Sequence, residues 1–228
     1  MKVKVSEIFH SVQGEGLLAG VPSTFVRLSG CNLRCTWCDT PYASWNPEGD
    51  SMEANEIVDR IVEGGLNHVV LTGGEPMLFE ATELISQACH DLGKHVTIET
   101  AGTISRKVHC DLMSISPKLK NSVPTESPDW ASRHDQLRIQ IPVLAQLLND
   151  FDHQLKFVVT SATDLLEIDQ ILEQLPPIQP SRVLVMPEGR DSQKLWQSAR
   201  ELVPLVMERN WRLAPRMQID LFGDTKGT

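Results

Sequence analysis

The sequence predicts an α/β fold, namely an open, partial (β/α)6-type barrel of mainly parallel strands. Short apolar runs alternate along the chain with stretches that carry apolar residues at helical spacing. Several of these runs are apolar at nearly every position, as in strands that are covered on both faces. Eight such units typically need about 250 residues. Six units in a chain of 228 residues therefore suggest a barrel that does not close.

The strand candidates are short apolar runs bounded by polar, glycine or proline residues. In chain order they are Val3–Phe9, Ser23–Leu28, His68–Thr72, His95–Glu99, Asp111–Ser116, Gln154–Thr160 and Arg182–Met186. The carboxyl ends of parallel strands meet at one edge of a sheet, so we expect the active site at that edge.

Four helices are predicted between the strands, at Asn55–Glu63, Thr82–Leu92, Ala162–Leu175 and Ser192–Arg209. The dipeptides Gly64-Gly65 and Pro176-Pro177 end the first and the third of them. The stretch Leu137–Asn149 is ambiguous, because Pro142 interrupts it. Two polar, proline-bearing stretches are candidate mobile loops at the active site, Pro41–Asp50 and Lys118–Arg133.

Composition narrows the classes of function. Lys and Arg total 21 against 30 for Asp and Glu, and this net charge of -9 argues against direct binding of nucleic acid. Aromatic residues make up 5% of the chain, too few for an evident base-stacking platform. No apolar run approaches the ~20 residues of a membrane span, and the N-terminus lacks the apolar core of a signal peptide. We therefore expect a single-domain cytoplasmic protein.

Three of the five cysteines, Cys31, Cys35 and Cys38, fall within eight residues. Cys89 and Cys110 stand apart and are expected to be small core residues. The spacing Cys-x3-Cys-x2-Cys in one loop suits a [4Fe-4S] cluster held by three thiolates, which leaves the fourth iron free to bind a small molecule. The alternative is a zinc knuckle completed by a distant ligand, although no fourth Cys or His stands at a familiar spacing.

This cysteine spacing, with Trp37 before the last cysteine, resembles the signature of the radical S-adenosylmethionine (SAM) superfamily. The resemblance implies that SAM chelates the open iron. Gly73 and Gly74 would bring backbone carbonyls close to its amino group, and the Glu75 carboxylate would accept from the same group. The expected SAM-binding residues are Trp37, Cys38, Asp39, Gly73, Gly74, Glu75, Glu99, Ser116, Pro117 and Lys118. The alternative for such polar groups at strand ends is that they bind water.

A narrower motif lies upstream, where the sequence reads IFHSVQGEG from Ile8 to Gly16. With Arg27, the Cys-Asp-Thr of residues 38–40 and the Thr-Gly-Gly-Glu-Pro of residues 72–76, it resembles the 7-carboxy-7-deazaguanine synthase family. The resemblance runs from Val5 to about Gly223. In the closing segment many relatives carry His where this chain has Gln218, so no role is assigned to that residue.

A pterin substrate has a planar ring edged with donors and acceptors, and a carboxylate. Gln13 offers both an amide donor and a carbonyl acceptor, and Arg27 can grip a carboxylate with two nitrogens. Glycine at 14 and 16 would let backbone lie against a ring. The resemblance implies that Thr40 is a ligand of Mg²⁺. The expected substrate-binding residues are Val12, Gln13, Gly14, Glu15, Arg27 and Thr72.

The resemblance also implies the reaction. An electron from an external donor such as flavodoxin cleaves cluster-bound SAM to a 5′-deoxyadenosyl radical, which takes hydrogen from C6 of 6-carboxy-5,6,7,8-tetrahydropterin. The ring contracts, ammonia leaves, and 7-carboxy-7-deazaguanine forms for 7-deazapurine and queuosine biosynthesis. No catalytic residue beyond the cofactors is expected, because the protein orients the reactants and excludes water. The family also suggests a homodimer.

We expect one domain over residues 1–228, with a substrate-binding segment at 1–30, the cluster loop at 31–40 and a short closing segment at 211–228. Two other functions compete with this prediction. A radical SAM activase of a glycyl-radical partner enzyme would share the cluster without requiring the Gln13 and Arg27 motif. A zinc-binding interaction module would be colourless and would not respond to SAM.

Overall fold

Six parallel strands form the centre of the fold, and the computed structural model describes all 228 residues of the chain. The strands are β2 (Pro22–Leu28), β4 (His68–Gly73), β5 (His95–Thr100), β6 (Leu112–Ile115), β7 (His153–Val159) and β8 (Val183–Pro187). Each pairs in parallel with the next, as predicted for the repeat.

Three further strands extend this sheet to nine, in the order β3-β1-β2-β4-β5-β6-β7-β8-β9. They are β1 (Lys2–Val12), β3 (Asp50–Glu53) and β9 (Arg212–Leu213). Strands β1 and β3 are antiparallel to their neighbours, and β9 is parallel to β8. Because β3 and β9 lie at opposite edges, the barrel stays open. The sequence analysis missed β3, since four mostly polar residues carry no strand periodicity.

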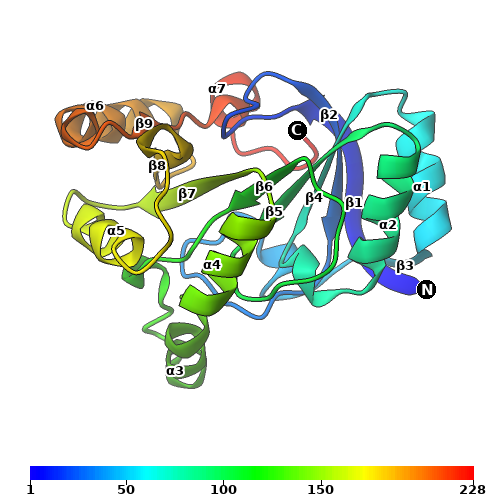
Figure 1. Cartoon of the computed structure of the whole chain (residues 1–228), viewed down its shortest axis with the longest axis horizontal. Helices are drawn as coiled ribbons and strands as arrows, with labels where there is room; N and C mark the ends of the chain where they lie inside the picture. The colour runs from blue at the N-terminus through cyan, green and yellow to red at the C-terminus, as the bar shows by residue number, and fades with distance from the viewer.

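Seven α-helices accompany the sheet: α1 (Ala54–Glu63), α2 (Ala81–Asp91), α3 (Pro128–Leu137), α4 (Ile141–Asp150), α5 (Asp164–Leu172), α6 (Ser192–Glu208) and α7 (Met217–Phe222). Figure 1 shows α1 and α2 at one end of the sheet, α4 across its middle, and α5 and α6 at the other end. No helix combines the length and the apolar composition that crossing a lipid bilayer requires.

The prediction of a loop over Lys118–Arg133 was wrong in its second half, where α3 begins at Pro128. Proline fits the first turn of a helix, where its missing N–H has no partner to lose. The only buried residue of α3 is His134, so the helix lacks the apolar stripe by which it could be predicted. Pro142 likewise lies in the first turn of α4, which resolves the ambiguous stretch as a helix.

One crossover contains no helix. Residues 101–111 connect β5 to β6 in an irregular path, so the predicted alternation of strand and helix fails there. The Arg106 guanidinium anchors this connection by donating to the carbonyls of Met77 (2.6 Å) and Leu78 (2.9 Å) and by pairing with Glu83 (3.0 Å).

Alternate strand residues divide between a core and an inner face. On β7, Leu155 and Phe157 belong to the main hydrophobic core of 32 buried residues, whereas Gln154 and Lys156 make polar contacts on the inner side. Cys89 is fully buried in the core, as expected, and Cys110 packs against it.

A β-bulge in β1 changes which residues face inward. Val5 is paired with Leu28 and Glu7 with Arg27, so Ser6 is an extra residue on β1. Before the bulge, Val5 packs in the core. After it, Glu7 pairs with the cavity-lining Arg27. An unbroken alternation would have put Val5 and Glu7 on the same face, so the bulge redirects the second half of the strand.

Candidate functional site

The inner face of the sheet opens into a cavity of about 560 Å³ at the carboxyl ends of the parallel strands. Of the residues expected to bind the cluster, SAM, Mg²⁺ or substrate, all but two line it: Val12, Gln13, Gly14, Glu15, Arg27, Cys31, Cys35, Trp37, Cys38, Asp39, Thr40, Thr72, Gly73, Gly74, Glu99, Ser116 and Lys118. The exceptions are Glu75 and Pro117. The structure thus brings together residues from positions 12 to 118, while their individual roles remain predictions.

The cysteine loop contributes the free thiols of Cys31, Cys35 and Cys38 to the cavity wall. No three His, Cys, Asp or Glu side chains converge as ligands of a single metal ion would. A [4Fe-4S] cluster takes its thiolates on different irons, so its ligands need no common point. Burial raises the pKa of Cys31 and Cys35 to about 12, so iron must displace their protons. The three thiols therefore fit a cluster better than a zinc knuckle.

Neighbouring elements hold the cysteine loop in shape. The Arg34 N–H donates to Nδ1 of His134 on α3 (3.0 Å), and the Trp45 indole donates to the Cys35 carbonyl (3.0 Å). The Nε2 atom of His134 lies 2.9 Å from Ser122 Oγ. Because Nδ1 accepts, the neutral ring carries its proton on Nε2. Burial lowers the pKa of His134 to about 4, which favours this neutral form.

The two glycines after β4 allow a close approach of backbone to backbone. A Cβ atom on Gly73 would lie 2.0 Å from the Leu28 carbonyl oxygen, and one on Gly74 would lie 2.2 Å from the Gly30 carbonyl oxygen. The end of β4 can therefore pack directly against the end of β2 and the start of the cysteine loop.

Glu75 is not among the residues that line the cavity. Its fully buried carboxylate accepts from the Thr100 hydroxyl (2.8 Å), the Met77 N–H (3.0 Å) and the Ala101 N–H (2.7 Å). These contacts engage the carboxylate within the protein, and its contact with the SAM amino group stays a prediction. The N–H groups that follow β4 and β5 have no strand partner there, and Glu75 supplies the acceptor they need.

Arg27 projects from β2 into the cavity with part of its hydrogen-bonding capacity unused. Its Nε atom pairs with Glu7 (2.6 Å), and the Tyr42 hydroxyl donates to the same carboxylate (2.8 Å). The terminal nitrogens of Arg27 make no hydrogen bond within the protein, so they can bind an anionic ligand. Phe9 and Phe25, paired across β1 and β2, stack with ring centroids 4.9 Å apart beside it.

Five other predicted residues make contacts within the protein. Lys118 Nζ donates to the carbonyl (2.7 Å) and the hydroxyl (2.8 Å) of Ser116, and the Thr72 hydroxyl donates to Glu99 (2.8 Å). Gln13 is nearly buried, with its amide nitrogen 3.1 Å from the Ser23 hydroxyl. The prolyl residue between Ser116 and Lys118 does not reach the cavity.

Four cations of the cavity were not predicted, Lys156, Arg190, Arg216 and Lys226, and two of them pair with Glu15. Lys156 Nζ lies 2.5 Å from Glu15, and Arg216 Nε lies 3.1 Å from the same carboxylate. Arg216 also binds Asp39 (2.6 Å) and the Gly189 carbonyl (2.6 Å). The sequence could have indicated Lys156 as a site residue, because a lysine inside an otherwise apolar strand needs a polar partner. Arg216 does not follow a strand of the repeat, so the strand pattern gave no indication of its role.

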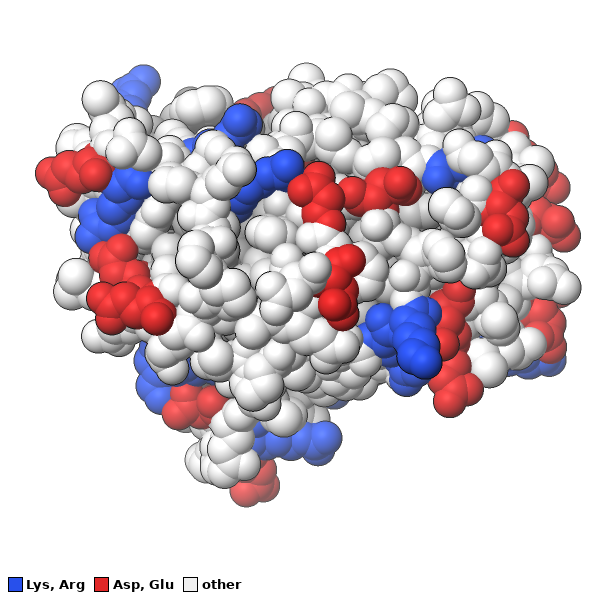
Figure 2. Space-filling model, viewed as in Figure 1, with Lys and Arg blue, Asp and Glu red and all other residues white.

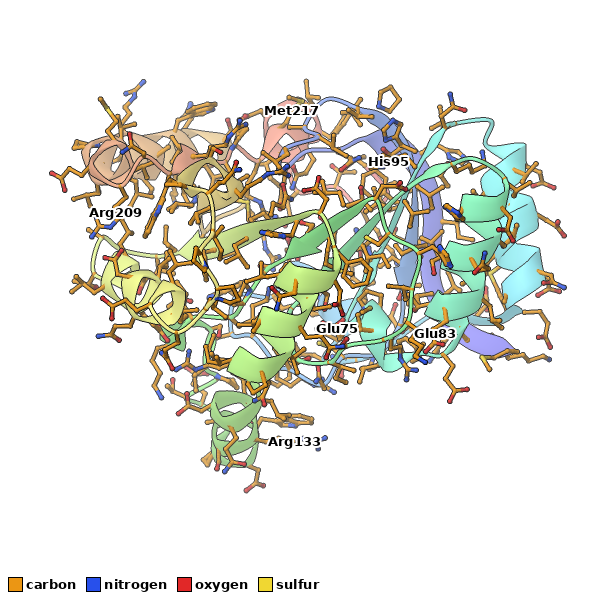
Figure 3. All side chains as sticks on the ribbon, in the orientation of Figure 1. Glu75, Glu83, His95, Arg133, Arg209 and Met217 are labelled. Carbon is orange, nitrogen blue, oxygen red and sulfur yellow. The ribbon has the colours of Figure 1, made fainter.

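The closing segment packs over the N-terminal motif. The Met217 N–H donates to the Gly14 carbonyl (2.9 Å), which fixes the start of α7 (Figure 3). Gln218 donates to Glu15 (2.7 Å), and its amide oxygen occupies the place that a Cβ on Gly14 would take. Such a Cβ would also lie 2.9 Å from the Gln218 backbone nitrogen, so a side chain at residue 14 would displace both the Gln218 side chain and the start of α7.

The last residues of the chain also lie along the cavity. Asp224 pairs with Arg190 (3.3 Å), which itself donates to the Cys38 carbonyl (2.6 Å). The Lys226 ammonium lies 4.1 Å from the centroid of the Tyr42 ring. The C-terminal tail, Gly223–Thr228, thus forms part of the wall.

The chain resembles proteins of known family over nearly its whole length. The family model "Radical SAM superfamily" matches residues 25–121. A 7-carboxy-7-deazaguanine synthase of Halobacterium salinarum is 42% identical over 98% of this chain and 92% of its own. One of Rhodopirellula baltica is 43% identical over 98% of this chain and 88% of its own. The crystal structure of QueE from Escherichia coli superposes with a TM-score of 0.71 at 23% identity, covering 94% of this chain and 93% of that one, and it supports the fold.

Proposed function

Because the chain belongs to the 7-carboxy-7-deazaguanine synthase family of radical SAM enzymes, we propose that it converts 6-carboxy-5,6,7,8-tetrahydropterin to 7-carboxy-7-deazaguanine with loss of ammonia. It is a radical SAM lyase of deazapurine biosynthesis, and its product serves the route to queuosine.

The observation that carries this proposal is that a single cavity joins the three-cysteine loop to the wall bearing Arg27 and Gln13. Radical chemistry requires the cluster and the substrate in one water-poor space. A cavity of about 560 Å³ lies within the usual range of small-molecule sites, which favours a small substrate over a glycyl-radical partner protein.

Cys31, Cys35 and Cys38 would hold the [4Fe-4S] cluster. When bound, the cluster supplies the electron that cleaves SAM and so starts hydrogen abstraction from the substrate. The Thr40 hydroxyl, which lines the same cavity, would be the protein ligand of Mg²⁺, and most of the ion's other ligands would be water and substrate oxygens.

The side chains of the cavity bind and orient the substrate. The free terminal nitrogens of Arg27 would hold the pterin carboxylate. Phe9 and Phe25 provide an apolar wall beside that group. The Gln13 amide and the Glu15 carboxylate would meet the polar edge of the ring.

The partners and the location are proposed from the family resemblance and the composition of the chain. We propose an external one-electron donor such as flavodoxin, a homodimeric assembly and a cytoplasmic location for a chain that forms one domain. On the face shown in Figure 2, acidic and basic side chains are intermixed around a largely uncharged centre.

The experiment is an anaerobic assay of reconstituted protein with SAM, dithionite, Mg²⁺ and the tetrahydropterin, read by mass spectrometry. We expect 7-carboxy-7-deazaguanine over many turnovers with SAM not consumed. Cleavage of SAM to 5′-deoxyadenosine without this product would keep the radical SAM activity and overturn the proposed substrate.

A further inference from the structure

Lys156 is a buried cation in the cavity to which the proposed reaction assigns no role. Residues on either side of it on β7 point into the hydrophobic core, so its own side chain points to the inner face. The side chain is only 8% exposed. Its Nζ atom lies 2.5 Å from Glu15 Oε2 and 3.6 Å from Glu99 Oε1. One ammonium therefore bridges the predicted substrate side and the predicted SAM side of the cavity.

Three side chains donate hydrogen bonds to Glu15, and two of them, Lys156 and Arg216, are cations. Lys156 approaches from β7, Arg216 from the segment before α7, and Gln218 from α7 itself. On the other side of Lys156, Glu99 accepts from the Thr72 hydroxyl. Burial alone would raise the pKa of Glu15, but Lys156 and Arg216 together hold it well below its usual range.

The geometry leaves Glu15 able to bind one more donor. A carboxylate offers about four acceptor positions, and Lys156, Arg216 and Gln218 occupy three of them. Glu15 lines the cavity. The pyrimidine edge of a pterin carries N–H donors, and a hydrogen bond from such a donor to an ionised carboxylate is among the stronger ones.

We propose that Lys156 is a positioning residue that holds the Glu15 carboxylate in place as the acceptor for a pyrimidine N–H of the pterin. This inference deepens the proposed function and rests on it. Without the ammonium, the buried Glu15 carboxylate would lie near the partly exposed Glu99 with only Arg216 to compensate it, so burial would favour its protonated form, which is a weaker acceptor.

The test measures binding apart from turnover. Pterin-6-carboxylate, which carries no hydrogen at C6, is titrated by fluorescence into anaerobic holoenzyme with SAM between pH 5.5 and 8.5. For Lys156→Met we expect affinity at pH 7 to fall about tenfold or more, the loss of a hydrogen bond to a charged group. In this variant Lys156 no longer holds down the pKa of Glu15. Its affinity relative to the wild type should therefore fall further as pH drops and Glu15 takes up a proton, by up to about tenfold per pH unit.

Two variants serve as controls. Lys156→Arg keeps the positive charge and should restore most of the affinity and the wild-type pH profile. Arg209→Met removes a cation that pairs with Asp169 outside the cavity, so it should leave binding unchanged (Figure 3).

The variant Glu15→Gln tests the same role of Glu15 even if the Lys156→Met protein does not fold. It should weaken binding without adding pH dependence, and Lys156→Met should cost little more in that background. The inference is overturned if Glu15→Gln binds like the wild type, or if folded Lys156→Met keeps wild-type affinity at every pH. A wild-type holoenzyme that neither binds the pterin nor forms product would instead overturn the proposed function.

Discussion

Single buried side chains decide how the strand ends of this cavity are held. Glu75 is the clearest case, because its carboxylate accepts three hydrogen bonds and none of its donors is a cation. Burial raises its pKa. The carboxylate serves as the acceptor for the N–H groups of Met77 and Ala101, and it thereby joins the end of β4 to the end of β5.

Replacing Glu75 by Ala should therefore destabilise the protein even before SAM is added. Two buried N–H donors would lose their acceptor, and we expect a loss of about 3 kcal/mol in the free energy of unfolding. Urea unfolding of the protein without SAM measures this change in the free energy of unfolding. Glu80→Ala, at an exposed position on the same turn, should change the stability by less than about 0.5 kcal/mol. If Glu75 served SAM alone, both variants would unfold like the wild type.

The guanidinium of Arg27 is shared between a protein partner and the proposed ligand. Its Nε atom is engaged by Glu7, and its terminal nitrogens are free. In Arg27→Lys one ammonium must serve both partners, so we expect KM for the pterin to rise about tenfold or more with a smaller change in kcat. Steady-state kinetics at saturating SAM test this, and Arg60→Lys on the exposed face of α1 is the control. An unchanged KM would remove Arg27 from the substrate site.

At the scale of elements, α3 supports the cysteine loop through His134 and through Trp130, whose ring centroid lies 4.2 Å from the Arg34 guanidinium. His134 is the buried residue of that helix, and its ring joins Arg34 of the loop to Ser122. The helix has little other apolar contact, so its position depends on this neutral imidazole and on the Trp130 contact. The loop and the helix are therefore coupled although about a hundred residues separate them.

Acid should weaken this contact. The pKa of His134 is about 4 in the folded protein against 6.5 for the ordinary side chain. Its contribution is thus fully present above pH 6.5 and is lost as pH falls toward 4, because the unfolded chain binds the proton first. Thermal unfolding from pH 7.5 to 4.5 measures the slope. His134→Asn keeps an acceptor without titrating, so its stability should depend less on pH over this range. Equal slopes for the two proteins would contradict the assignment.

For the whole molecule, the open barrel is completed by segments from both ends of the chain. Arg216 contacts Glu15 from the N-terminal motif, Asp39 after the cysteine loop and Gly189 after β8. The C-terminal tail adds the contacts of Asp224 and Lys226. The wall of the cavity is therefore complete only when all of these segments have docked.

Removing residues 224–228 should open this cavity without unfolding the chain. The tail is mostly exposed and its one ion pair is a surface pair, so we expect a change in stability below about 1 kcal/mol. Pterin-6-carboxylate should bind several-fold more weakly, because part of the wall is lost. Fluorescence titration measures the loss of affinity, and urea unfolding of the same protein shows whether the stability has changed. Wild-type affinity in the shortened chain would show that the tail does not shape the binding site.

The sequence by itself determined the features that depend on neighbouring residues. The cysteine spacing, the glycines after β4 and the apolar parallel strands are local patterns, and they were sufficient to predict the six-strand repeat and the edge that bears the cavity. The tertiary structure decided what depends on register and docking. The bulge at Ser6 selects which residues of β1 face inward. The fold buries Glu75 against the N–H groups that follow β4 and β5, and it brings Lys156 to Glu15, 141 residues away in the chain. Such contacts follow from how distant segments pack, which no short stretch of sequence encodes.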